Sequence, residues 1–134
     1  MENGIDRLED GWDIRAMRGI GIDEVLIGRA LRLHAGSSRI EVHGPAELKT
    51  GSEALPVHAS ARINLDRLPR LLDQVVAEVH AADSGTLGIR FAGGWRLDVP
   101  VSPRAVGWII GLRGTAFLAS LPGGGVRTSD RPRS

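Results

Sequence analysis

Residues 91–100, FAGGWRLDVP, repeat with small changes a stretch nearer the start of the chain, residues 34–45, HAGSSRIEVHGP. Both stretches contain Ala-Gly, two further residues, and then Arg, an aliphatic residue, an acid and Val. Apolar and polar residues alternate on both sides of the glycines, which is typical of a β-hairpin with one buried face. The repetition therefore predicts two related hairpins in one chain.

The first hairpin turns at Gly36-Ser37. A two-residue type II′ turn needs a positive φ at its first central position, which glycine adopts without steric cost. This turn sets Leu33 opposite Ile40 and Arg32 opposite Glu41, so that apolar residues face apolar residues along the ladder. On the polar face we predict a cross-strand ion pair between the arginine and the glutamate.

The second hairpin needs a longer turn. A two-residue turn would set Phe91 opposite Arg96, and this slip of one residue would send the apolar side chains of the two strands to opposite faces. A loop over residues 92–94 corrects the register and sets Ile89 opposite Leu97. The last residue of this loop is a glycine, as the left-handed position of a G1 bulge requires.

The similarity continues upstream, because residues 22–25, IDEV, resemble residues 76–79, VAEV. We therefore predict two β-β-β units, over about 20–45 and 75–103, at a spacing of about 57 residues. Two copies are too few for a solenoid. They indicate a pseudo-symmetric architecture whose halves share one core.

Residues 64–76, NLDRLPRLLDQVV, break the alternation, because their leucines recur at helical spacing. We predict one short helix there, with Asp66 as its N-cap. Two late strands are predicted over 106–111 and 115–121, whereas residues 43–58 are expected to form a surface loop. The predicted fold is α+β and mainly β: duplicated antiparallel β-hairpin units that form a sheet pair or a partly open barrel with one short helix.

A single β-rich domain is expected over residues 11–126, between a flexible N-terminus over 1–10 and a flexible basic tail over 127–134. A small β protein must also protect its edge strands. We expect the late strand over 115–121 to pair with a second copy, so that a homodimer is the expected assembly.

The composition is that of a soluble globular protein, with 42% hydrophobic and 25% charged residues and a formal net charge of +1. So small a net charge argues against nucleic acid and membranes as partners. The chain has no cysteine, which excludes disulfides and thiol catalysis. We expect no secretion signal and no membrane span, and therefore a cytoplasmic protein. Lys49 is the only lysine among 17 basic residues, which we interpret as the codon bias of a GC-rich bacterial genome.

Turn and core motifs form a wider pattern along the chain. They are Gly11-Trp12, the leucines of 68–72, the Val-rich stretch 75–79, the hairpin 87–99, Trp108, and the turn from Pro122 to Gly124. This pattern resembles an uncharacterised bacterial family, the domain of unknown function numbered 6188, over about residues 11–126. The chain departs from the family at residues 105–107, Ala-Val-Gly, where the relatives carry an acid before the tryptophan. The resemblance implies the fold and carries no activity.

Candidate catalytic residues lie mainly on the first hairpin. His34, Arg39 and Glu41 share its polar face with His43, and His80 lies in the second unit. These groups are candidates for an acid–base or anion-binding site, although one face of an antiparallel sheet is normally left to water. No HxH, HExxH or GxSxG pattern occurs, so we predict no metal site, no cofactor and no serine nucleophile.

The candidate binding residues are Trp95, Trp108 and Phe117, because exposed aromatic side chains often dominate protein interfaces. Packing in the core is the alternative for the tryptophans. We expect a non-enzymatic protein-interaction or structural module that associates with itself or with another protein. The alternative is a small-ligand-binding or hydrolytic pocket between the two repeat halves.

Overall fold

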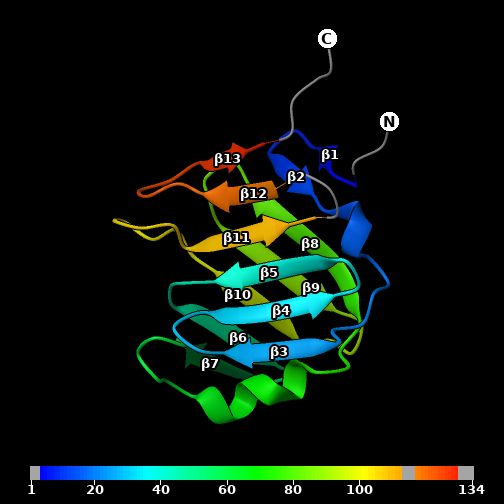
Figure 1. Ribbon diagram of the computed structural model, residues 1–134, viewed down its shortest axis with the longest axis vertical. Coiled ribbons are helices and arrows are strands. Elements are labelled where there is room, and N and C mark those ends of the chain that lie inside the picture. Colours follow the sequence, from blue (N-terminus) through cyan, green and yellow to red (C-terminus); the bar gives the residue numbers. More distant parts are fainter. Residues whose placement is uncertain (1–3, 113–116, 130–134) are drawn as a thin grey trace.

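The structure, a computed structural model, describes residues 4–112 and 117–129. Two antiparallel β-sheets face each other across a common hydrophobic core and do not close into a barrel (Figure 1). The fold is mainly β, as the alternating sequence predicts. Of the two predicted architectures, the sheet pair is the one that forms.

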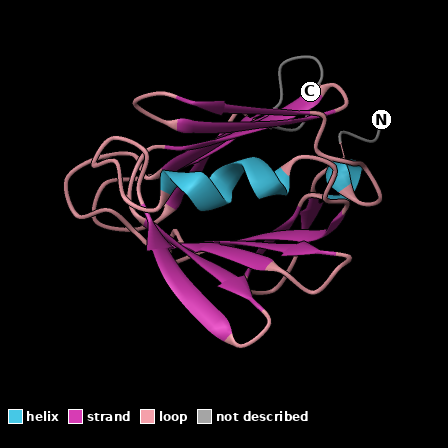
Figure 2. Ribbon diagram, turned by 90° about the horizontal axis from the view of Figure 1, so that it is seen from below, coloured by secondary structure: helices cyan, strands magenta, loops and turns pink. Residues whose placement is uncertain are grey.

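The strand orders define the two layers. The seven-stranded sheet contains, in spatial order, β1 (Asp6–Arg7), β2 (Gly11–Asp13), β8 (Val76–Ala82), β9 (Leu87–Phe91), β10 (Arg96–Val99), β6 (Ala46–Thr50) and β7 (Glu53–Val57). The six-stranded sheet contains β13 (Val126–Thr128), β12 (Phe117–Ser120), β11 (Trp108–Gly111), β5 (Ser38–Val42), β4 (Leu31–Ala35) and β3 (Glu24–Ile27). The described helices are two 3-10 helices, η1 (Arg15–Met17) and η2 (Leu65–Leu71). Figure 2 shows η2 lying across the opening between the sheets.

Both hairpins have the predicted registers. Leu33 pairs with Ile40 in β4–β5, and Ile89 pairs with Leu97 in β9–β10. All four side chains are fully buried, which confirms that the two apolar faces meet in one interior. The second loop has the predicted length, and Gly94 at its end has a φ of +99°.

The duplication extends beyond the hairpins to five strands in each half. The strands β3-β4-β5 lie side by side in one sheet and β8-β9-β10 in the other. After each set the chain crosses to the opposite sheet, where β6 pairs with β10 and β11 pairs with β5. The two pairings are equivalent, because Leu48 lies opposite Leu97 and Ile110 lies opposite Ile40. Each half therefore completes the sheet of the other.

These connections give the sandwich two distinct ends. We call the end with the β4–β5 and β9–β10 turns the tip end. The other end carries the β5–β6 and β10–β11 connections, and we call it the crossover end.

The interpretation of residues 43–58 as a surface loop is wrong, because they contain β6 and β7. Ala46 and Leu48 are buried while the residues between and after them are exposed, so the alternation is present but short. Pro56 lies in the edge strand β7, where a missing N–H costs no ladder bond. The flanking Gly, Ser and Pro residues hid this hairpin from the sequence analysis.

The predicted helix over 64–76 is present only as η2, a 3-10 helix. It begins after Asn64 rather than at the predicted cap Asp66, and the Asn64 side chain donates to the C=O of Pro56 at 2.6 Å. Pro69 lies inside the helix and cannot donate a backbone hydrogen bond, which disfavours an α-helical turn. The apolar side of η2 is buried as expected, because Leu68 and Leu71 are fully inaccessible to solvent.

Strands also occupy part of both predicted flexible ends. Within residues 1–10, β1 pairs with β2, and within 127–134, β13 extends into the tail and pairs with β12. Residues 1–3, 113–116 and 130–134, and with them the first two residues of the predicted strand over 115–121, lie outside the described residues. The expected dimer edge over 115–121 is wrong for its described part, because β12 already has β11 and β13 on its two sides. In the described ranges no helix has the length and apolar character needed to cross a bilayer.

We expect Gly94→Ala to lower the free energy of unfolding by about 1–3 kcal/mol, because a non-glycine residue is strained at this φ. No atom lies within 4 Å of the position of the added Cβ, so the backbone conformation alone causes the loss. Urea denaturation measures it. Gly93→Ala is the matched control, because its Cβ would meet only the Gln74 Oε1 at 3.5 Å and its φ is not left-handed. Equal losses for the two variants would contradict the role assigned to Gly94.

Candidate functional site

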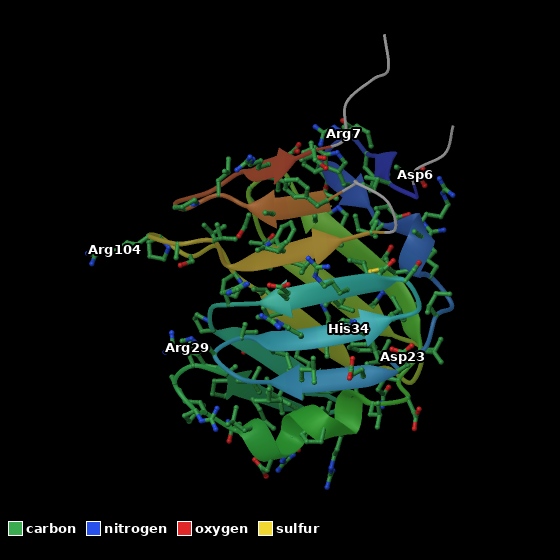
Figure 3. All side chains as sticks on the ribbon, viewed as in Figure 1. Asp6, Arg7, Asp23, Arg29, His34 and Arg104 are labelled. Atoms are coloured by element: carbon green, nitrogen blue, oxygen red, sulfur yellow. The ribbon has the colours of Figure 1, made fainter. Side chains whose placement is uncertain are left out.

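Three of the four candidate catalytic residues lie together on the outer face of the six-stranded sheet. Figure 3 shows His34 on β4. It stands opposite Arg39 on β5, and Glu41 follows on the same face. The Glu41 Oε2 accepts a hydrogen bond from the Arg39 Nε at 3.0 Å, and its Oε1 lies 3.0 Å from the His43 Nε2. Period-two alternation is sufficient to bring these groups to one face.

The carboxyl group of Glu41 is the centre of this cluster, and its side chain is only 14% exposed. Burial opposes its ionisation, but the hydrogen bonds with His43 and Arg39 and the charges of Arg32 and Arg39 outweigh burial, so the pKa of Glu41 lies below its ordinary value. The predicted Arg32–Glu41 ion pair does not form as a contact. The two residues stand opposite each other, but Glu41 pairs with neighbours on its own strand, and Arg32 acts through its charge.

His80 lies on the outer face of the other sheet, on β8. Its Nε2 is 3.5 Å from the Asp10 Oδ1. The core of the sandwich separates His80 from His34, so the four candidate catalytic residues do not form one site.

An open groove of about 520 Å³ lies beside His80 on the outer face of the seven-stranded sheet. Gly88 leaves space at its floor between His80 on β8 and Asp98 on β10. The space between the two repeat halves, in contrast, is filled by the core. The charged residues that line the groove are Glu47, Glu78, His80, Arg90, Arg96 and Asp98.

The charges in this groove neutralise one another. Arg90 pairs with Glu78 at 3.2 Å, and Arg96 pairs with Asp98 at 2.8 Å. Lys49 on β6 adds a contact to Asp98 at 3.2 Å. The groove can therefore accept a small polar molecule, but a charged ligand would first have to displace an existing ion pair.

The three candidate binding residues do not form one surface either. Trp108 is fully buried, and its Nε1 donates to the C=O of Gly85 at 2.8 Å. Trp95 is half-buried and packs against the core near the tip end. Phe117 is half-buried and lies on the outer face of the six-stranded sheet, where it pairs with Gly111 of the neighbouring strand β11. The guanidinium of Arg127 lies 5.9 Å from the centre of its ring.

A surface that the sequence analysis missed lies at the tip end. Residues 19–22 and 73–76 run antiparallel there, with the N–H of Ile22 donating to Gln74 at 2.8 Å and the N–H of Val76 donating to Ile20 at 2.9 Å. Apart from Val76, the first residue of β8, these residues belong to no strand, and the two segments are about 50 residues apart in the chain. No local pattern in the sequence indicates their pairing.

Three aliphatic side chains in or next to these segments are exposed. The exposed fractions are 36% for Ile20, 46% for Leu72 and 40% for Val75. The surface is tied to both hairpins: a Cβ at Gly36 would lie 3.4 Å from the Ile20 side chain, and Ala92 donates to the C=O of Val75 at 2.8 Å. It is therefore built on rigid elements rather than on a free loop.

Two exposed acids lie beside these aliphatic residues. Asp73 donates its N–H to the C=O of Ile22 at 2.8 Å, and this pairing brings it next to Asp23. Neither carboxylate forms an ion pair within the described residues. We call Ile20, Leu72, Val75, Asp23 and Asp73 the tip surface. Across the described ranges, no group of three or more side chains suitable for a metal ion is found.

We expect Glu41→Gln to lower the free energy of unfolding at pH 7 by about 1–3 kcal/mol, because it leaves Arg39 and His43 without their carboxylate. The lowered pKa means that the unfolded chain binds the proton more readily than the folded one, so this contribution is present above pH 4.5 and is lost as the pH falls through the folded pKa. Urea denaturation at pH 7 and near pH 3.5 measures both values. Glu78→Gln, which breaks the exposed pair with Arg90, is the control and should cost under about 0.5 kcal/mol. If Glu41→Gln lowers the free energy of unfolding by the same amount at both pH values, the stabilising role of the ionised Glu41 is contradicted.

Comparisons with known proteins give one match. A family model described as a family of unknown function, DUF6188, matches residues 13–130. Neither the curated proteins nor the solved structures contain a match. The matched range includes every strand from β3 to β13, and thus both halves of the duplication with their reciprocal crossings. The chain therefore belongs to the family of unknown function DUF6188.

Proposed function

We propose that this domain is a non-enzymatic protein-interaction module that binds its partner through the tip surface. The observation that carries the proposal is that two paired segments at the tip end carry Ile20, Leu72 and Val75, each more than a third exposed, and two acids without an ion-pair partner among the described residues. Exposed aliphatic groups rimmed by charge are typical of protein interfaces.

The distribution of the polar candidates favours binding over catalysis. His34, Arg39 and Glu41 lie on one outer face and His80 lies on the other, so no acid and base among them converge on a common reacting atom. Glu41 is hydrogen-bonded to Arg39 on its own strand and to His43 just after it, which is compatible with a solvated sheet face.

The size of the aliphatic contribution limits what the partner can be. Burying the exposed part of each of the three aliphatic side chains contributes roughly 1 kcal/mol. Three such contributions do not reach the 4.1 kcal/mol or so of a millimolar complex, even before the cost of association. A partner must therefore also satisfy Asp23 and Asp73, and cationic groups are the ones that do so.

The groove beside His80 supports a second candidate function, binding of a small polar ligand. Its volume of about 520 Å³ is in the range of ligand pockets. All its carboxylates and arginines except Glu47 have partners within 3.2 Å, so the support is weaker than for the tip surface. Self-association, a cytoplasmic location and a GC-rich bacterial origin stay predictions.

The tip surface can be tested by removing its aliphatic groups. We expect the double substitution Leu72→Ser and Val75→Ser to abolish capture of the partner when the immobilised protein is exposed to an extract of the native cell and cross-linked. Mass spectrometry identifies what is captured. Both side chains are exposed, so the fold should persist, and thermal unfolding checks this.

The matched control is Leu8→Ser, which removes a side chain that is 40% exposed at the crossover end. It should leave the captured protein unchanged. If the double variant still captures the same protein as the unmodified chain, the tip surface is not the binding surface.

A further inference from the structure

The elements β3 and η2 form a bar along one side of the sandwich. They are in contact and run in opposite directions, as Figure 1 shows at the bottom of the molecule. The hydrogen bond from Asp73 to Ile22 joins the end of η2 to the start of β3. The residues just before β3 therefore lie beside those just after η2, at the tip end of the bar. The residues just after β3 and those just before η2 lie together at its other end.

The tip end of this bar is acidic and aliphatic. Asp23 precedes β3, and Leu72 and Asp73 follow η2. Neither carboxylate has an ion-pair partner in the described ranges, although Arg70 in the last turn of η2 lies three residues before Asp73. The electrostatic energy of this end falls when cations from outside are placed against it.

The crossover end of the bar is basic and aliphatic. Arg29 follows β3, and Arg62 and Ile63 precede η2. Both arginines are exposed and lack an ion-pair partner in the described part of the chain, and Ile63 is 41% exposed. The acid in the first turn of η2, Asp66, lies 3.8 Å from Arg67. Figure 3 shows Asp23 and Arg29 at opposite ends of the β3–β4 hairpin.

We propose that copies of this chain associate head to tail, with the tip surface of one copy bound to Arg29, Arg62 and Ile63 of the next. This inference rests on the proposed function, because it names the partner of the tip surface. The two ends match in kind: two acids meet two arginines, and the aliphatic groups of Ile20, Leu72 and Val75 meet that of Ile63. Such a contact is heterologous, so it leaves a free end and continues into a ring or a filament.

A two-fold dimer of tip surfaces does not satisfy the same groups. It would bring four carboxylates, two from each copy, into one interface, and like charges across an interface cost several kcal/mol. A two-fold contact between the crossover ends would place four arginines together in the same way. Charge complementarity therefore excludes both of these contacts and favours contacts that join the tip end of one copy to the crossover end of another.

The first test is sedimentation velocity of the whole chain over a range of concentrations at low salt. We expect the weight-average sedimentation coefficient to rise continuously with concentration, without a plateau at the dimer. Raising the salt to 0.5 M should reduce association, because exposed charges are screened within a few ångström at such concentrations. A protein that stays monomeric throughout would overturn the inference.

Two charge variants test the ends separately. The first carries Asp23→Arg and Asp73→Asn and has basic groups at both ends of the bar. The second carries Arg29→Asp and Arg62→Asp and has acidic groups at both ends. Asp73 and Arg62 have left-handed φ values of +71° and +60°, which Asn and Asp tolerate, so both variants should fold. Thermal unfolding of each variant checks this.

Each variant alone should associate at least about tenfold more weakly than the unmodified chain. Mixed in equal amounts, the two variants should associate again, because the basic tip end of one now meets the acidic crossover end of the other. Glu9→Arg is the control, since it reverses an exposed acid away from the bar and should change nothing. Failure of the mixture to associate, or association of either variant at full strength, would overturn the head-to-tail arrangement.

The outcome for the proposed function is separate. If the chain is monomeric but captures another protein through Leu72 and Val75, the tip surface binds a different partner, and only the head-to-tail inference fails. If substitution of Leu72 and Val75 affects neither capture nor self-association, the proposed function fails as well.

Discussion

The structure depends on the burial of two equivalent apolar faces against each other. Leu33 and Ile40 form the centre of one face and Ile89 and Leu97 the centre of the other, and all four are inaccessible to solvent. Neither face can be buried within its own hairpin unit, because a sheet has to pack against another layer. The crossing of β6 and β11 strengthens this dependence, since each sheet is completed by strands from the other half. The two halves therefore fold as one cooperative unit.

Local patterns were sufficient to predict the hairpins. The alternation of apolar residues determines which side chains face inward, and the different turn lengths follow from the requirement that both strands of a hairpin bury the same face. The crossings could not be predicted, because nothing in residues 43–58 indicates that β6 pairs with a strand about 50 residues later. The 3-10 form of η2 also depends on context, since Asn64 is bound to Pro56 of β7 instead of capping a helix.

The same distinction applies to the candidate sites. His34, Arg39 and Glu41 were predicted to share a face because they lie on one hairpin, where sequence spacing determines orientation. Whether His80 lies on the same face as these three residues could not be predicted, because this depends on which of the two sheets each hairpin belongs to. The tip surface was missed for a related reason. It is formed by two irregular segments, 19–22 and 73–76, that meet only after both sheets are in place, and a Val or Leu in such a segment cannot be told from a core residue by sequence alone.

The surface features gather where the two halves differ. Under the duplication, β8 corresponds to β3, and β12 corresponds to β7. In the second half the outer strands have a further neighbour, because β8 pairs with β2 and β12 pairs with β13. In the first half β3 and β7 are the edge strands of their sheets. On that side η2 lies across the opening instead of further strands, and its counterpart in the duplication is the shorter η1, which precedes β3 as η2 precedes β8. A symmetric pair of halves would present the same charges twice. The greater length of η2 beside β3 removes this symmetry, so the polarity on which head-to-tail association would depend arises where the two helices differ.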